Sequence, residues 1–182
     1  SNMLPPYGGT GSGSYGDKEP SMERDCLPLH TDFGIIRPAR PEDTDQIIKM
    51  VGRLATHHGD IPTLEPAIPR RDLFSEKPWI HVIVAEADDS LVGYAALCGL
   101  INLHLGKRGM DMHHLFIEAS FRGKGIGRGL VEGCKIHARS MSCGYLTVGT
   151  HPENHRAQAF YDAIGFDRKD AHPPKFSLQL AS

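Results

Sequence analysis

The sequence has neither a long apolar run nor an excess of charge of one sign. Its 182 residues carry a formal net charge of −2 at pH 7, and 40% of them are hydrophobic. Without a long apolar run the chain offers no span for a bilayer, and a balanced charge gives no general attraction to nucleic acid or to an anionic membrane surface. We therefore expect one soluble domain, large enough to bury a full core.

The chain also lacks the cysteine spacing of structural zinc sites and dithiol redox centres. Its four cysteines form no C-x-x-C pair: Cys26, Cys98, Cys134 and Cys143. This spacing predicts neither kind of site, and we expect no metal. No apolar segment of the secretory type is seen, so we expect a reducing, cytoplasmic setting.

The first two dozen residues differ in composition from the rest. Ser1-Asn2 ahead of Met3 resembles the remnant of a cleaved expression tag, and the stretch from Pro5 to Pro20 is rich in Gly, Ser and Pro. A segment of this kind cannot bury enough apolar surface to fold. We expect residues 1–24 to form a mobile tail and residues 25–182 to form a single domain that begins to fold near Phe33.

Apolar patterns predict the elements of the first two thirds of the chain. The helical spacing of Ile47, Val51 and Leu54 predicts a first helix, and Asp88-Asp89-Ser90 reads as a hairpin turn. The predicted order is a strand over 33–37, a helix over 41–55, a short helix from 69, hairpin strands over 79–85 and 91–97, a loop over 106–109 and a strand over 110–117.

Glycine alternates with other residues in the stretch from Phe121 to Leu130, which reads FRGKGIGRGL. Apolar residues 115–117 precede it and a helical pattern follows, so the order is strand, glycine turn, helix. Glycines let consecutive N–H groups point into one concavity, and the helix adds unpaired N–H groups and its positive dipole end. The turn is suited to holding phosphate.

Spacing excludes two familiar phosphate loops. A Walker A loop needs Ser or Thr after Gly-Lys, but Gly125 follows Lys124, and Arg128 stands where the dinucleotide fingerprint needs its third glycine. The pattern that fits is R-x-x-G-x-G, formed by Arg122, Gly125 and Gly127. On this local sequence alone, a glycine turn without a ligand is the alternative.

A second motif follows one strand later. Residues 145–149 read as a strand, and the segment from Asn154 to Phe166 reads N-x-x-A-x-x-F-Y-x-x-x-G-F. The two motifs in this order resemble the GNAT acyl-CoA N-acetyltransferases, over roughly residues 33 to 180. The resemblance implies an α/β fold, with a mixed, mostly antiparallel sheet of six to seven strands and helices on both faces. It also implies a splayed notch for acyl-CoA between the strand ending near Ile117 and the strand over 145–149.

The resemblance implies acetyl-CoA as co-substrate and assigns residues to it. The pyrophosphate would lie on the turn, the pantetheine and thioester would meet backbone groups of the central strand, and an asparagine and an aromatic residue would complete the site. The residues so implied are Arg122, Gly123, Lys124, Gly125, Ile126, Gly127, Arg128, Phe116, Ile117, Asn154 and Phe160.

The chemistry of amine acetylation requires a base, an oxyanion donor and help for the leaving thiolate. An ammonium of pKa about 10.4 must lose its proton before it attacks. By resemblance, the Ile117 N–H would hold the oxyanion and Tyr161 would face the sulfur; without the motif, Tyr161 would read as a core aromatic. Cys134 lies on the apolar face of a predicted helix, so we expect direct transfer in a ternary complex rather than an acyl-enzyme.

The base has more than one candidate. His113 and His114 are neighbours on a predicted strand, so they should point to opposite faces and at most one should reach the cleft. Either could also be a half-buried histidine of the sheet. Glu118, at the strand end, is a second candidate that could act through water.

His57 and His58 end the first predicted helix. They could be solvated residues interacting with the helix dipole, and as metal ligands they lack a third partner at recognisable spacing. In GNAT folds the loop after this helix borders the acceptor, so with Asp60 these residues could bind an amine substrate.

Several segments resemble the spermidine/spermine and thialysine acetyltransferase branch of the family, among them residues 71–74, 84–86, 91–94 and 106–107. That branch carries a Glu-Asp pair where this chain has His113-His114, so the resemblance favours a small primary amine but not a polyamine. Acetylation of a protein lysine or N-terminus, and a non-catalytic acyl-CoA sensor, stay open as alternatives. Members of the branch are dimers, which implies a homodimer, and a final strand over 175–180 would offer an edge for pairing.

Overall fold

The computed structural model describes residues 26–61, 64–169 and 176–180. Their strands and helices, in chain order, are β1 (Leu29–Thr31), β2 (Gly34–Pro38), η2 (Pro41–Asp43), α1 (Thr44–His57), α2 (Ala67–Leu73), β3 (His81–Ala87), β4 (Ser90–Asn102), η3 (Leu103–Leu105), β5 (Lys107–Ile117), η4 (Ala119–Phe121), α3 (Ile126–Ser140), β6 (Tyr145–Thr147) and α4 (His155–Ala163). None of the described helices is long and apolar enough to cross a membrane.

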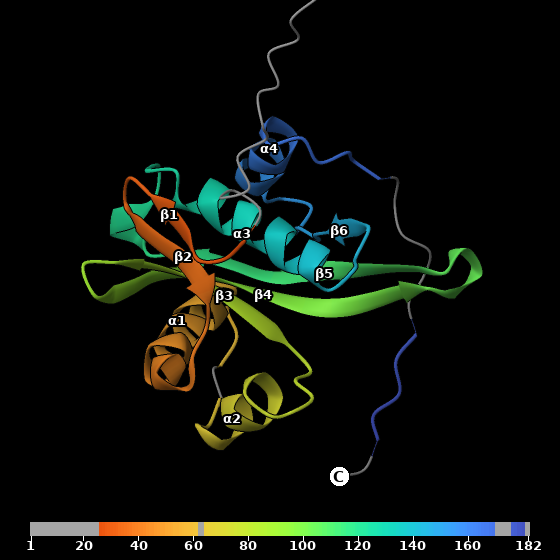
Figure 1. Cartoon of the computed structure of the whole chain (residues 1–182), viewed down its shortest axis with the longest axis horizontal. Helices are drawn as coiled ribbons and strands as arrows, with labels where there is room; N and C mark the ends of the chain where they lie inside the picture. Colours follow the sequence, from red (N-terminus) through yellow and green to blue (C-terminus); the bar gives the residue numbers. More distant parts are fainter. Residues whose placement is uncertain (1–25, 62–63, 170–175, 181–182) are drawn as a thin grey trace, which may run out of the picture.

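The strands form one sheet in the order β1-β2-β3-β4-β5-β6. All neighbours are antiparallel except β5 and β6, which run parallel. The helices α1 and α2 lie on one side of this sheet, and α3 and α4 lie on the other (Figure 1). The α/β class, the mostly antiparallel sheet and the helices on both faces are confirmed.

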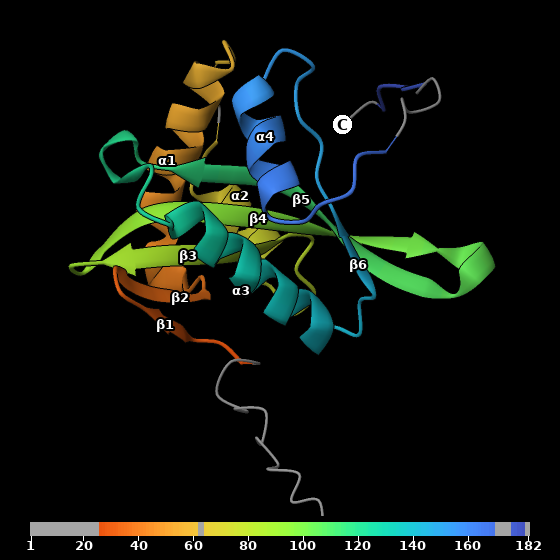
Figure 2. The ribbon, with the colours of Figure 1, turned by 90° about the horizontal axis from the view of Figure 1, so that it is seen from above.

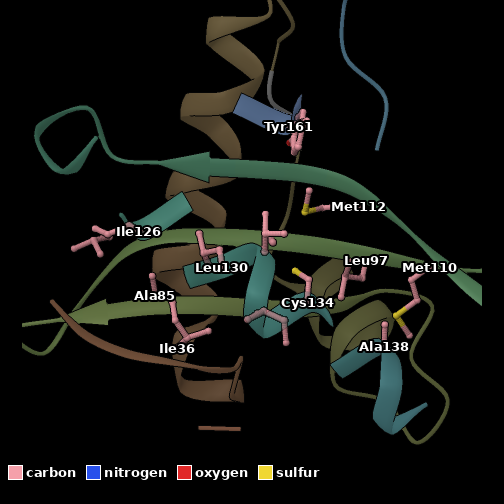
Figure 3. Packing of buried hydrophobic residues seen from close by; sticks show 14 of the residues in the cluster. Ile36, Ala85, Leu97, Met110, Met112, Ile126, Leu130, Cys134, Ala138 and Tyr161 are labelled. Carbon is pink, nitrogen blue, oxygen red and sulfur yellow. The ribbon is translucent and has the colours of Figure 1, made fainter. Parts of the chain in front are cut away.

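The core has two halves because side chains alternate along the central strands. On β3, Ile83 packs toward α3 with Leu130 and Cys134, which lie in the cluster drawn in Figure 3. Val84 packs toward α1 in a second cluster that contains Tyr94 and Phe116. Each face of the sheet is thus covered by its own helices.

A buried ion pair fixes the start of α1. Arg37 of β2 donates to both carboxylate oxygens of Asp43, at 2.7 and 2.9 Å, and to Glu86 of β3. Burial alone would raise the pKa of Asp43, but the hydrogen bonds from Arg37 and from the Arg40 backbone lower it. The helix that carries His57 and His58 is therefore tied to the sheet at its first turn.

The structure corrects three expectations about element bounds. The sheet begins at β1, ahead of the predicted start near Phe33. Residues 107–109 belong to β5 and are no loop, because β4 and β5 continue beyond the last pair with β3, at Leu97, and beyond the last pair with β6, at Gly109. There they form a two-stranded arm (residues 101–108; Figure 2). Residues 176–180 form no strand, and Lys175 lies outside the described residues, as does the tail expected over 1–24.

Candidate active site

The glycine turn presents unpaired N–H groups. Gly123 and Gly125 have φ of 78° and 83°, and a side chain at either would meet no described atom within 4 Å. Among the described residues, the backbone N–H groups from Gly123 to Arg128 find no acceptor, and the first that does is Gly129, which donates to the Gly125 carbonyl at 3.0 Å. The turn and the first turn of α3 can therefore bind an anion through their backbone.

The turn is anchored to β5 and to α4. Arg122 Nε donates to the Ile117 carbonyl at 3.0 Å. A Cβ on Gly127 would lie 3.3 Å from Phe160 Cζ and 3.4 Å from Ile117 Cδ1, so a side chain here would require Phe160 to shift slightly. A hollow of about 280 Å³ lies beside the turn, lined by residues that include Phe33, Gly125, Arg128, Glu132 and Lys135.

The far edge of β5 is unpaired next to this turn. On this edge, β6 pairs with β5 only from Gly109 to Asp111, and no described strand pairs with Met112 to Ile117 on the side away from β4. Because Glu118 N–H donates back to Val92 of β4, the alternation of the strand turns the Ile117 N–H and carbonyl toward this free edge. The Phe116 carbonyl instead faces Gly93 of β4. The geometry therefore favours Ile117 over Phe116 for backbone contacts in the notch.

Asn154 precedes α4 as its N-cap, and Tyr161 lies within the helix. Asn154 caps the helix, since its Oδ1 accepts from Ala157 N at 3.0 Å. Tyr161 packs between Phe160 and Phe166, at ring distances of 5.2 and 5.4 Å. Its hydroxyl makes no hydrogen bond with a described residue, and burial, together with the nearby thiol of Cys134, raises the pKa of Tyr161 to about 12.

Cys134 lies beneath Tyr161 in the same cluster and is fully buried (Figure 3). Burial raises the pKa of its thiol to about 12, so the thiolate needed for nucleophilic attack is scarce at neutral pH. This agrees with the expectation that Cys134 is a core residue.

His113 and His114 do not point to opposite faces, contrary to the prediction. Opposite β4, Ala96 pairs with His114 and Leu97 pairs with Met112, so His113 is the extra residue of a β-bulge. The bulge breaks the alternation and stacks the two imidazoles, with ring centroids 4.5 Å apart and planes 16° apart. His113 is exposed and His114 is half-buried.

His114 contacts Tyr94 of β4, with Nδ1 lying 3.0 Å from the tyrosine Oη. Burial, then the charges of His113 and His58, lower the pKa of His114 to about 4, so its imidazole is neutral at pH 7. Sequence reasoning missed Tyr94, because the contact depends on the register of two strands and on the bulge between them. The only available signal was the pairing of two apolar runs, which does not fix register.

The remaining candidates lie around this group. His57 and His58 are exposed at the end of α1, with ring centroids 5.9 Å apart, and Asp60 is exposed just beyond. No group of three or more His, Cys, Asp or Glu in the described part of the chain could hold a metal ion. Glu118 forms an ion pair with Arg53 of α1, and both line a second hollow of about 480 Å³.

Comparisons with known proteins agree with this geometry. The family model described as Acetyltransferase (GNAT) family matches residues 53–166. The chain is 26% identical to Thialysine N-epsilon-acetyltransferase of Bos taurus over 143 residues, 73% of this chain and 84% of that protein. It is 31% identical to Peptidyl-lysine N-acetyltransferase YjaB of Escherichia coli over 134 residues, 72% of this chain and 80% of that protein.

One similar solved structure is an aminoglycoside acetyltransferase from an uncultured soil metagenomic sample, in complex with sisomicin. It has a TM-score of 0.69 and 14% sequence identity, and the match covers 79% of this chain and 95% of that one. At this identity the likeness concerns the fold alone.

Proposed function

Because this chain belongs to the acetyltransferase (GNAT) family, we propose that it transfers an acetyl group from acetyl-CoA to a primary amine of a small molecule. Family membership makes it an acetyl-CoA-dependent N-acetyltransferase with an amine acceptor. The observation that carries the finer proposal is the meeting of the unpaired N–H groups at 123–128 with the free edge of β5.

The pyrophosphate of acetyl-CoA binds the N–H groups of the turn, with Arg122, Lys124 and Arg128 supplying positive charge. The pantetheine arm then runs along the free edge of β5, past Asn154, and packs near Phe160. Asn154 supports this placement because its Oδ1 is used by the helix cap, while its side-chain nitrogen makes no hydrogen bond with a described residue. The thioester carbonyl reaches the Ile117 N–H, which would also hold the oxyanion.

The transfer is a direct attack in a ternary complex. The ammonium gives one proton to a base, and the amine nitrogen bonds to the thioester carbon. The nitrogen then loses a second proton to solvent, and the C–S bond breaks to release CoA thiolate and the neutral amide. His113 is the proposed base, because it is exposed in the bulge and no described residue holds its ring nitrogens. Glu118 is the alternative, although its carboxylate is already paired with Arg53.

Tyr161 stabilises the leaving thiolate. A thiol has a pKa of about 8.5, whereas the pKa of Tyr161 is raised to about 12. The tyrosine therefore holds its proton more tightly than the thiolate would, and it acts by donating a hydrogen bond while solvent supplies the final proton.

His57, His58 and Asp60 lie on the α1 side of the sheet and form the proposed border of the acceptor. A small molecule is favoured by the likeness to Thialysine N-epsilon-acetyltransferase. The likeness to YjaB supports the second candidate, acetylation of a protein lysine. A screen of small amines and lysine peptides with acetyl-CoA, following free thiol release, separates the two: turnover of peptides alone would contradict the proposal.

We also propose a cytoplasmic setting and a homodimer. Apolar side chains are exposed at the tip of the arm, where Leu103 and Leu105 lie, and at Phe176, Leu178 and Leu180. Surfaces of this kind are typical of contacts between subunits.

A further inference from the structure

The hydrogen bond between Tyr94 and His114 decides which nitrogen of His114 carries a hydrogen. Tyr94 is 1% exposed, and the only described partner of its hydroxyl is Nδ1 of His114, at 3.0 Å. Burial raises the pKa of Tyr94, so the hydroxyl keeps its hydrogen at every pH at which the protein is used.

A buried hydroxyl hydrogen without an acceptor is costly. If Nδ1 carried a hydrogen, Nδ1 would donate to the tyrosine oxygen and the tyrosine's own hydrogen would be left without a described acceptor. Tyr94 therefore donates to Nδ1, and the single hydrogen of the neutral imidazole sits on Nε2. His114 consequently presents an N–H donor, and it cannot take the proton of the attacking ammonium at Nε2.

This donor is free to meet a ligand. Nε2 of His114 makes no hydrogen bond with a described residue. It is also not fully buried: among the described residues, the one fully buried side-chain polar atom without a partner is Nε2 of His137. His114 lies on the α1 face of β5, beside the free edge from Met112 to Ile117. An amine substrate that approached this edge from the α1 side would pass the Nε2–H of His114.

The part of β5 around His114 has no unpaired carboxylate to receive a second ammonium group. The histidines whose charges act on His114 are His113, which stacks on it, and His58, just after the end of α1. The carboxylates on β5 and directly after it are engaged, since Asp111 accepts from Thr147 Oγ1 at 2.8 Å and Glu118 is paired with Arg53. Asp60 and Glu65 are exposed on the segment that follows α1. The surface of β5 around His114 therefore offers imidazole N–H donors, and it has no free carboxylate.

We propose that His114 is a positioning residue whose Nε2–H binds a carboxylate of the acceptor, so that the acceptor is an amine of the amino-acid class. This inference rests on the proposed function, because it assumes that the amine meets the thioester at the free edge of β5. The two histidines of the bulge then have different roles: His113 accepts the proton of the ammonium, and His114 binds the carboxylate of the substrate.

The tautomer is tested without turnover. Two-bond ¹H–¹⁵N correlation spectra at pH 7 distinguish a protonated Nε2 from a protonated Nδ1, and His114→Gln identifies the signal. We expect the Nε2–H form in the wild type and a mixture of forms in Tyr94→Phe, which keeps the ring but loses the donor. A wild-type spectrum with hydrogen on Nδ1 overturns the inference.

The substrate class is tested by binding to the enzyme saturated with CoA. L-Lysine and 1,5-diaminopentane differ only in the carboxylate, and calorimetry compares them. We expect lysine to bind roughly ten- to a hundredfold more tightly, the range for a hydrogen bond to a charged group. His114→Phe should remove most of this preference, whereas His114→Gln, whose amide reaches near the position of Nε2, should retain much of it.

His30→Gln, at an exposed position of β1, is the matched control and should leave the preference unchanged. With substrates that turn over, the loss in His114→Phe should appear in KM for lysine more than in kcat. Equal binding of the two ligands, tighter binding of the diamine, or binding of neither overturns the inference. The proposed function is tested separately, by the affinity for acetyl-CoA, so failure of this inference can be told apart from failure of the proposed function.

Discussion

Arg122 donates from Nε to the carbonyl oxygen of Ile117 at 3.0 Å, and this contact links the two halves of the candidate site. The arginine fixes the phosphate-binding turn against the end of β5, and it occupies the carbonyl of Ile117 while leaving the N–H of the same residue free. A single side chain thus sets the distance between the turn and the proposed oxyanion donor.

The first prediction concerns the turn. Gly125→Asp places a negative charge where the pyrophosphate is expected, so the affinity for acetyl-CoA should fall at least about tenfold, the effect of roughly 1.4 kcal/mol. Gly125→Ala is the matched control, because it shares the strain of a side chain at φ 83° but adds no charge. Calorimetric titration with acetyl-CoA compares the three proteins. Unchanged affinity in Gly125→Asp would show that the ligand assignment is wrong.

The second prediction concerns assembly. Light scattering at micromolar concentration should give the mass of a dimer, and the double variant Leu103→Lys and Leu105→Lys should be a monomer if the arm forms the contact. Phe176→Lys with Leu178→Lys tests the C-terminal segment in the same way. Trp79→Lys, which changes an equally exposed apolar residue elsewhere, should stay dimeric. A monomeric wild type would contradict the proposal.

The third prediction concerns the dependence of stability on pH. Burial lowers the pKa of His81. Burial and then the charge of His81 lower the pKa of His137, and the pKa of His114 is lowered to about 4. The unfolded chain, with histidine pKa values near 6.5, binds more protons in this range than the folded one. The stabilisation is complete above pH 6.5 and is lost as the pH falls toward the folded pKa values.

For His114 alone, after allowing for partial exposure to solvent, we expect a loss of roughly 1–2 kcal/mol in the free energy of unfolding between pH 7 and pH 4. Urea unfolding at several pH values measures it. His114→Phe should flatten the curve, while His30→Gln, at an exposed position, should not. If the free energy of unfolding of the wild type rose as the pH was lowered from 7 to 4, this explanation would be wrong.

The predictable and unpredictable parts of the molecule differ in a physical way. The central strands and α3 could be predicted because burial leaves a pattern in the sequence. β3 and β4 are covered on both faces and show continuous apolar runs, whereas α3 buries one face and shows apolar residues at a spacing of about 3.6. Residues 106–109 were predicted as a loop, and no strand was predicted for the rest of the arm. Ile101, Leu103 and Lys107 are all exposed, so no burial period marks the arm. The stacking of His113 on His114 depends on a bulge, and a one-residue irregularity leaves no composition signal.

The same distinction holds for the site. The turn at Arg122 to Arg128 could be found from sequence because its chemistry resides in the backbone, and glycine marks that chemistry directly. The contact between Tyr94 and His114 could not, because it joins side chains of two strands whose register only the fold defines.

The last prediction concerns Tyr161. If its hydroxyl stabilises the leaving thiolate, the interaction exists mainly in the transition state, so Tyr161→Phe should lower kcat and leave the affinity for acetyl-CoA nearly unchanged. A hydrogen bond to a charged group predicts a loss of roughly a hundredfold, at the lower end of the range for acid catalysis. The phenylalanine keeps the ring between Phe160 and Phe166, and the lost hydroxyl has no described partner, so stability should change little.

Tyr145→Phe on β6 is the control for removing a tyrosine hydroxyl, and its kcat should match the wild type. Single-turnover measurements at saturating acetyl-CoA ensure that the chemical step is the one compared. The raised pKa of Tyr161, about 12, adds a second expectation: kcat should show no loss of activity attributable to Tyr161 ionisation up to pH 10. If Tyr161→Phe retains nearly full kcat with chemistry limiting, Tyr161 is a packing residue, and water or another side chain must stabilise the thiolate.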